Sequence, residues 1–126
     1  MRDALLVAFV AALFSACASQ ELRVYTVSQA SRKDIAGAER IVRNIAAETH
    51  LVKDTEWTDF EVNARYMAPN VYLRALETWR QSFRIELSRM SWPPPKVFDQ
   101  ADRLLTLRLS EAFGRRLSRE QHIGPL

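Results

Sequence analysis

An α+β fold is predicted for this chain, with two helices packed on a small antiparallel sheet. Residues 31–51 and 98–119 repeat apolar side chains at the spacing of one helix face, whereas parts of residues 71–92 alternate apolar and polar side chains as strands do. The 126 residues are enough for one small domain. A three-helix all-α bundle is the alternative, and it requires residues 71–92 to form the third helix.

The composition is that of a globular protein, since 48% of the residues are hydrophobic and 26% are charged. A formal net charge of +3 is too small an excess to indicate nucleic acid, so no nucleic-acid partner is expected. Cys17 is the one cysteine of the chain, which excludes an internal disulfide. The domain must therefore be stabilised by packing.

The N-terminus has the layout of a secretory signal peptide, which we place at residues 1–16. Arg2 supplies positive charge, and residues 4–14 form an uncharged apolar run of 11 residues. A helix of that length reaches only about 16 Å. It cannot cross the ~30 Å of hydrocarbon in a bilayer, so no mature transmembrane helix is expected here.

The end of this run, Phe14-Ser15-Ala16-Cys17, resembles the lipobox of bacterial lipoproteins. The resemblance implies that a diacylglyceryl group is joined to the Cys17 sulfur, that the signal is cut just before Cys17, and that the new amine is acylated. Several acyl chains on one residue anchor a protein durably. The expected partner of Cys17 is therefore the membrane, with the domain facing the periplasm.

The residues around the cysteine refine this expectation. Ala18 and Ser19 follow it without an aspartate, which by the same resemblance favours the outer over the inner membrane. Ala16-Cys17-Ala18 is also similar to the cleavage site of the ordinary signal peptidase, which would release a soluble protein.

Residues 17–30 are expected to form a lipid-anchored tether ahead of a single domain at 31–126. Within the tether, residues 22–27 are rich in β-forming side chains and are either a short strand or an extended linker. Ser31 and Asp34 resemble a capping box and predict the first helix over 31–51. Residues 52–69 are expected to be irregular and to fold back on the core through four side chains: Trp57, Phe60, Tyr66 and Met67.

Residues 71–92 are predicted to form a hairpin that turns near residues 78–81. Phe83, Ile85 and Leu87 alternate with polar neighbours, and Ile85 lies off the stripe that a helix would form. A two-stranded hairpin alone is marginally stable, so a third strand is expected from residues 22–27 or 57–62. The second helix is predicted over 98–119, with Arg115, Arg116 and Arg119 complementing the dipole at its end.

No catalytic or metal-binding constellation is identified, and no cofactor is expected. His50 and His122 are the only histidines, and they stand far apart in the chain. Calcium could use the oxygens of an acidic cluster, but its spacing is not that of an EF-hand, so a solvated loop is the expectation. The cluster consists of Asp54, Glu56, Asp59 and Glu61.

Arginines of the predicted hairpin region form a candidate electropositive face for an anionic ligand: Arg74, Arg80, Arg84 and Arg89. Guanidinium groups bind phosphate and carboxylate in a bidentate manner. The alternative is an ordinary solvated surface.

The sequence thus predicts a small cell-envelope lipoprotein with a non-enzymatic binding or structural domain. Its partner is expected to be an envelope protein or an anionic envelope polymer. The alternatives are an immunity- or inhibitor-type lipoprotein and an enzyme with a carboxylate site that sequence motifs do not reveal.

Overall fold

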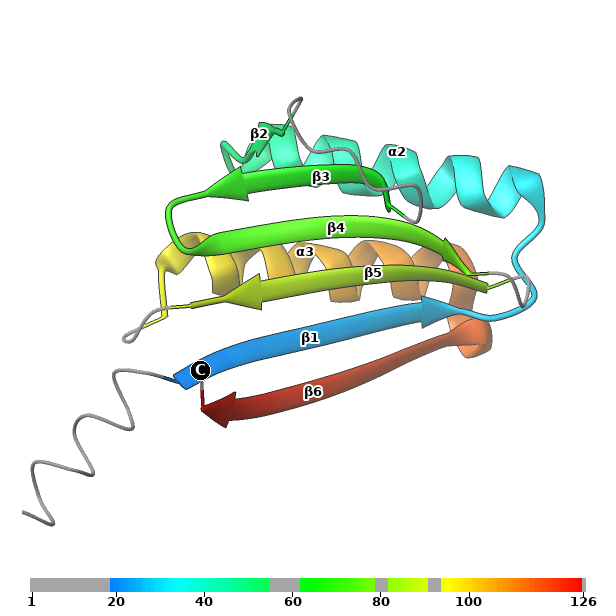
Figure 1. Cartoon of the computed structure of the whole chain (residues 1–126). Helices are drawn as coiled ribbons and strands as arrows, with labels where there is room; N and C mark the ends of the chain where they lie inside the picture. The colour runs from blue at the N-terminus through cyan, green and yellow to red at the C-terminus, as the bar shows by residue number, and fades with distance from the viewer. Residues whose placement is uncertain (1–18, 55–61, 79–81, 91–93, 126) are drawn as a thin grey trace, which may run out of the picture.

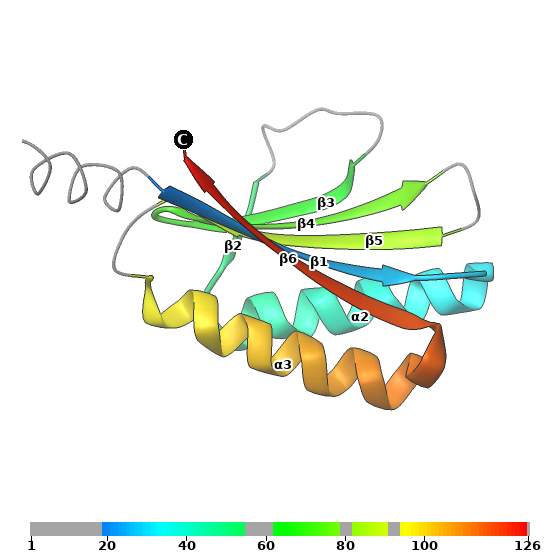
Figure 2. The same ribbon diagram turned by 90° about the horizontal axis from the view of Figure 1, so that it is seen from below.

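The protein is a six-stranded antiparallel sheet with two helices on one of its faces (Figures 1 and 2). The computed structural model describes residues 19–54, 62–78, 82–90 and 94–125. The predicted α+β class is confirmed, and the three-helix bundle is excluded because residues 71–78 and 82–89 are paired strands.

Four consecutive strands lie between the two helices in the sequence, and one strand lies at each end of the fold. The elements are β1 (Ser19–Val27), α2 (Arg32–Glu48), β2 (Val52–Lys53), β3 (Val62–Ala68), β4 (Val71–Thr78), β5 (Ser82–Arg89), α3 (Lys96–Phe113), the 3₁₀ turn η1 (Gly114–Arg116) and β6 (Leu117–Pro125). The strand order in the sheet is β2-β3-β4-β5-β1-β6.

β1 is an interior strand of the sheet, between β5 and β6. The strand predicted at residues 22–27 is confirmed as the third strand beside the hairpin, but the boundary of the domain at residue 31 is wrong. The reason is burial: Tyr25 and Val27 are fully buried, and they pair with Ile85 and Phe83 of β5. The folded domain therefore begins at Ser19, and the segment read as a tether is part of its core.

The start of α2 follows the predicted capping box. The Ser31 hydroxyl accepts a hydrogen bond from the Asp34 amide at 3.1 Å, and the Asp34 carboxylate accepts one from the Ser31 amide at 3.0 Å. A side-chain hydrogen bond from Arg116 lowers the pKa of Asp34. The helix ends at Glu48, before the predicted residue 51, because His50 adopts a left-handed backbone with φ of 60°.

The hairpin of β4 and β5 is confirmed, and so is the face on which its apolar side chains lie. Phe83, Ile85 and Leu87 are fully buried on the side of the helices, and Ile85 pairs with Ala75 of β4. The turn predicted near 78–81 lies largely outside the described residues.

Three strands were not predicted. The short β2 lies at residues 52–53, in the segment expected to be irregular, and pairs with β3. Residues 62–68, expected to be irregular, form β3, which pairs with β4, and Tyr66 is buried at 8% exposure as expected for a residue folded onto the core. Met67 points to the opposite face and is 36% exposed. Trp57 and Phe60 lie outside the described residues.

The third unpredicted strand is β6, which replaces the last turns of the expected second helix. α3 ends at Phe113 because Gly114 adopts a positive φ of 55°, and the chain then pairs with β1. Arg115, Arg116 and Arg119 therefore follow α3 rather than lying within it. The apolar repeat predicted over 98–119 includes Ala112, which is exposed, and Leu117, which lies in β6. The other five residues of that repeat are buried on α3: Phe98, Ala101, Leu105, Leu109 and Phe113.

The core lies between the helices and one face of the sheet, and it decides which substitutions the fold tolerates. Ile85→Asp places an unpaired carboxylate among fully buried side chains and is expected to lower the free energy of unfolding by more than about 3 kcal/mol. Leu107→Asp is the matched control, because Leu107 is 56% exposed, and should change stability by less than about 1 kcal/mol. Urea denaturation measures both variants, and an Ile85→Asp protein as stable as wild type contradicts the assigned core.

Candidate functional site

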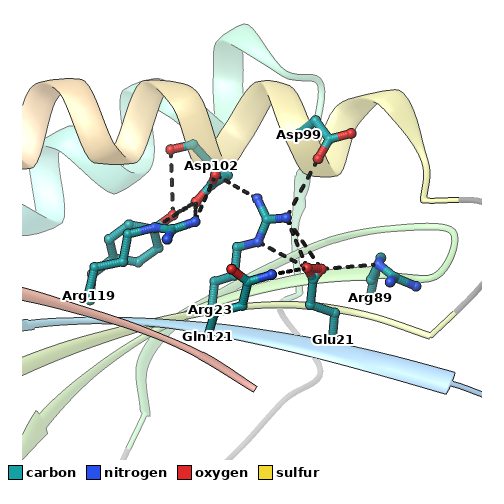
Figure 3. A network of polar contacts seen from close by, with 8 residues as sticks. Glu21, Arg23, Arg89, Asp99, Asp102, Arg119 and Gln121 are labelled. Atoms are coloured by element: carbon teal, nitrogen blue, oxygen red, sulfur yellow. Dashed lines mark hydrogen bonds and ion pairs between the residues drawn. The ribbon is translucent and has the colours of Figure 1, made fainter. Parts of the chain in front are cut away.

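Charged side chains gather between the helix-covered face of the sheet and the first half of α3 (Figure 3). We refer to them as the polar cluster. Its members come from β1, β5, β6 and α3: Glu21, Arg23, Tyr25, Arg89, Asp99, Asp102, Arg119 and Gln121.

Glu21 is the most enclosed acid of the polar cluster, with 3% of its surface exposed. Its carboxylate accepts hydrogen bonds from the Arg23 guanidinium at 2.9 Å and from the Gln121 amide at 3.0 Å. The Nε atom of Arg89, itself almost fully buried, lies 3.5 Å from the other Glu21 oxygen. One carboxylate thus joins three neighbouring strands.

Asp102 joins α3 to the sheet, as Glu21 joins the three strands. Its carboxylate lies 2.6 Å from Nη1 of Arg23 and accepts a hydrogen bond from Nη2 of Arg119 at 3.1 Å. The Tyr25 hydroxyl also donates to it. Because Arg23 bridges Asp102 and Glu21, α3 is joined to the sheet by one continuous network (Figure 3).

The ring of Phe98, in the first turn of α3, packs against two arginines of the polar cluster. The guanidinium carbon of Arg23 lies 4.6 Å from the centroid of the Phe98 ring, and that of Arg89 lies 5.7 Å from it. Both distances are within the range of cation–π attraction. Phe98 is fully buried, so the arginines are held between the sheet and the first turn of α3.

The polar cluster is electrically balanced, since its three arginines face three carboxylates. Burial raises the pKa of Tyr25 to about 12, and the hydrogen bond to Asp102 acts in the same direction. The hydroxyl therefore stays protonated at neutral pH and donates to Asp102. This arrangement holds elements together, and its charges are already engaged with one another.

The alternation of β1 is the signal that could have revealed this cluster. Glu21, Arg23 and Tyr25 are spaced by two residues, which places them on one face of a strand. Asp99 and Asp102 are three apart, which places them on one face of a helix. The prediction of a tether over residues 17–30 left this two-residue spacing in β1 uninterpreted.

The arginines of the predicted electropositive face do not all share one face. Arg74 and Arg84 lie on the face away from the helices, and both pair with Glu86, which is 6% exposed. Arg89 lies on the helix-covered face, in the polar cluster. Arg80 is outside the described residues. Of the four predicted arginines, the face away from the helices thus carries two, and their charge is partly balanced by a buried acid. Arg65, the partner of Arg74 on β3, lies on the same face.

The remaining candidates also separate in space. His50 is exposed at the end of α2, and His122 lies beside Glu120 on β6, at the far edge of the sheet from β2. Asp54 lies 3.5 Å from Arg65, whereas the other members of the acidic cluster fall outside the described residues. Within the described ranges, no group of three or more His, Cys, Asp or Glu side chains could hold a metal ion.

A shallow groove of about 450 Å³ runs between the two helices. Ile41, Asn44 and Ala47 line one side, and an ion pair between Glu48 and Arg108 closes it. None of the residues that line this groove belongs to the polar cluster.

No protein-family model matches the chain, and no curated protein is similar to it at a significant level. Among the described residues, no helix is both long enough and apolar enough to span a membrane.

The central role of Glu21 can be tested by removing its charge. Glu21→Gln leaves the buried Arg89 without its carboxylate, and the expected loss of unfolding free energy is about 3–5 kcal/mol. Glu120→Gln, at a side chain 67% exposed, should change it by less than about 0.5 kcal/mol. Thermal or urea unfolding compares the two, and equal stabilities would show that the cluster does not hold the fold.

Tyr25 should make stability depend on alkaline pH. Because folding raises its pKa from 10.0 to about 12, the folded state retains the phenolic proton that the unfolded chain loses. This contribution is complete below pH 10 and disappears as pH rises through about 12. The stability difference between wild type and Tyr25→Phe is expected to fall by at most about 1.4 kcal/mol per pH unit in that window. A difference independent of pH there contradicts the assignment.

Proposed function

We propose that this protein is a small lipoprotein of the bacterial cell envelope, whose domain acts by binding or support rather than by catalysis. The observation that carries the proposal is the position of Cys17. It ends the apolar run of a signal-peptide-like segment, and it stands only two residues ahead of β1, the strand at which the folded domain begins. Cleavage just before Cys17 would remove no part of the described domain.

The periplasmic side of the envelope, at the outer membrane, is the proposed location. Ala18 and Ser19 follow the cysteine without the aspartate that retains lipoproteins in the inner membrane. The domain needs no disulfide, because its layers are joined by packing and by the polar cluster. The domain can therefore fold after export without forming a disulfide.

The way in which the described charged groups are used supports the proposal of a binding or structural role. Three carboxylates are each paired with two arginines: Glu21, Asp102 and Glu86. Their negative charge is therefore used to hold the fold together. Tyr25 is held protonated well above neutral pH. A general acid or base is most effective when its pKa lies near the working pH, which is not the condition of this phenol. The proposed partner is an envelope protein or an anionic envelope polymer.

Lipid attachment at Cys17 tests the proposal directly. Cells expressing the full chain are grown with a fatty-acid analogue, and incorporation into the protein is measured. Cys17→Ser is expected to abolish labelling and to leave an unprocessed or soluble product. Ser15→Ala is the matched control, because it keeps a small residue beside the cleavage point and should be labelled as wild type is. Undiminished labelling of Cys17→Ser would refute the anchor.

A further inference from the structure

We infer that one end of the sheet rests on the lipid surface, with Ile123 and Met90 in contact with the bilayer interface. We call it the anchor-proximal end: it is where β1 begins, β6 ends and β5 ends (Figure 1). The inference rests on the proposed lipid anchor and goes beyond it, because it assigns an orientation and a contact surface.

The first step is the length of chain between anchor and domain. Only Ala18 separates Cys17 from Ser19, the first residue of β1. Two residues of fully extended chain span at most about 7 Å. A lipid on Cys17 therefore keeps the start of β1 within a few ångströms of the membrane surface. A domain on so short a connection cannot present an arbitrary side to the bilayer.

The second step is which residues lie at that end. The register places Glu21 of β1 opposite Ile123 of β6 and Arg89 of β5. Met90 follows Arg89 directly, and its amide donates to the carbonyl of Asn70, in the turn between β3 and β4, at 3.0 Å. The last strand, the end of β5 and this turn thus meet beside the anchor.

The third step is the distribution of exposed apolar side chains. Ile123 is 64% exposed and Met90 38%, and both lie at the anchor-proximal end. Val52 and Met67, which pair with each other one step before the β3–β4 turn, are 68% and 36% exposed. Leu107 of α3 is the remaining large exposed hydrophobic residue among those described. These residues do not form one patch, because β2 and β6 are the opposite edges of the sheet. They place apolar side chains across the width of the end that the short connection to Cys17 holds at the membrane.

The charges at this end fit a lipid surface as well. Lys53 follows Val52, and Lys96 begins α3 on the same side of the molecule (Figure 1). Both are exposed, and lysine side chains extend their ammonium groups toward phosphate headgroups while their stems cover apolar surface. Asp99, whose side chain is 58% exposed in the first turn of α3, lies 3.8 Å from Arg23. Together with the short connection to Cys17, the two lysines point to a phospholipid bilayer with anionic headgroups as the occupant of this end.

The test places a fluorophore at the predicted contact in the lipidated full-length protein. Acylation converts the Cys17 sulfur to a thioether, so an introduced cysteine is the only free thiol. Ile123→Cys and Met90→Cys are labelled with an environment-sensitive dye and reconstituted into phosphatidylethanolamine–phosphatidylglycerol vesicles that carry a nitroxide quencher on their lipids. Leu107→Cys is the matched control, since it replaces an equally apolar and exposed residue on α3, away from this end.

Quenching at positions 123 and 90 is expected to exceed that at 107 by about threefold or more, because an interfacial side chain lies within the headgroup region. Circular dichroism confirms that each variant is folded, as expected for substitutions at exposed positions. Equal quenching at 123, 90 and 107 in protein that carries the lipid overturns the orientation while leaving the anchor in place. A full-length chain that incorporates no lipid overturns the proposed function, and this inference with it.

Discussion

Burial of the Glu21 carboxylate is the constraint on which the arrangement of β1 depends. A carboxylate at 3% exposure is tolerated only when positive charge and hydrogen-bond donors surround it, and Arg23, Arg89 and Gln121 provide them from three adjacent strands. A shift of β1 by one residue would turn Glu21 to the opposite face and take its carboxylate away from the buried Arg89. The ion pairs therefore specify the register, while the apolar side chains beside them supply most of the favourable energy of burial.

Arginine is the main cation of this chain, and the structure shows what much of it does. Arg116 joins η1 to the start of α2 through Asp34, Arg119 joins β6 to α3 through Asp102, and Arg108 joins the two helices through Glu48. The planar guanidinium suits such connections because it donates several hydrogen bonds in a fixed geometry. Much of the positive charge that the sequence suggests for an external ligand is consequently used within the protein.

The early start of the sheet links architecture to the proposed location. A long linker would let a tethered domain act far from the membrane, whereas a strand that begins two residues after Cys17 holds it at the surface. In the proposed orientation, the exposed Ile123 side chain lies at the bilayer interface. An apolar side chain is more favourable there than in water. The anchor and the exposed end of the sheet are thus two parts of one proposal.

The sequence by itself determined the local features: the capping box at Ser31, the buried stripe of α3, and the alternation that makes residues 82–89 a strand. Each depends on side chains a few positions apart, so periodicity reveals it. Only the tertiary structure decided that β6 is a strand and that Glu21 meets Arg89 and Gln121, because these contacts join residues 68 to 106 positions apart. Leu117 continued the apolar spacing of α3, and the positive φ at Gly114 together with pairing to β1 overrode that pattern. Pairing with a distant strand leaves no periodic mark on the segment that receives it, which is why β6 and the contacts of Glu21 with Arg89 and Gln121 could not be predicted from the sequence alone.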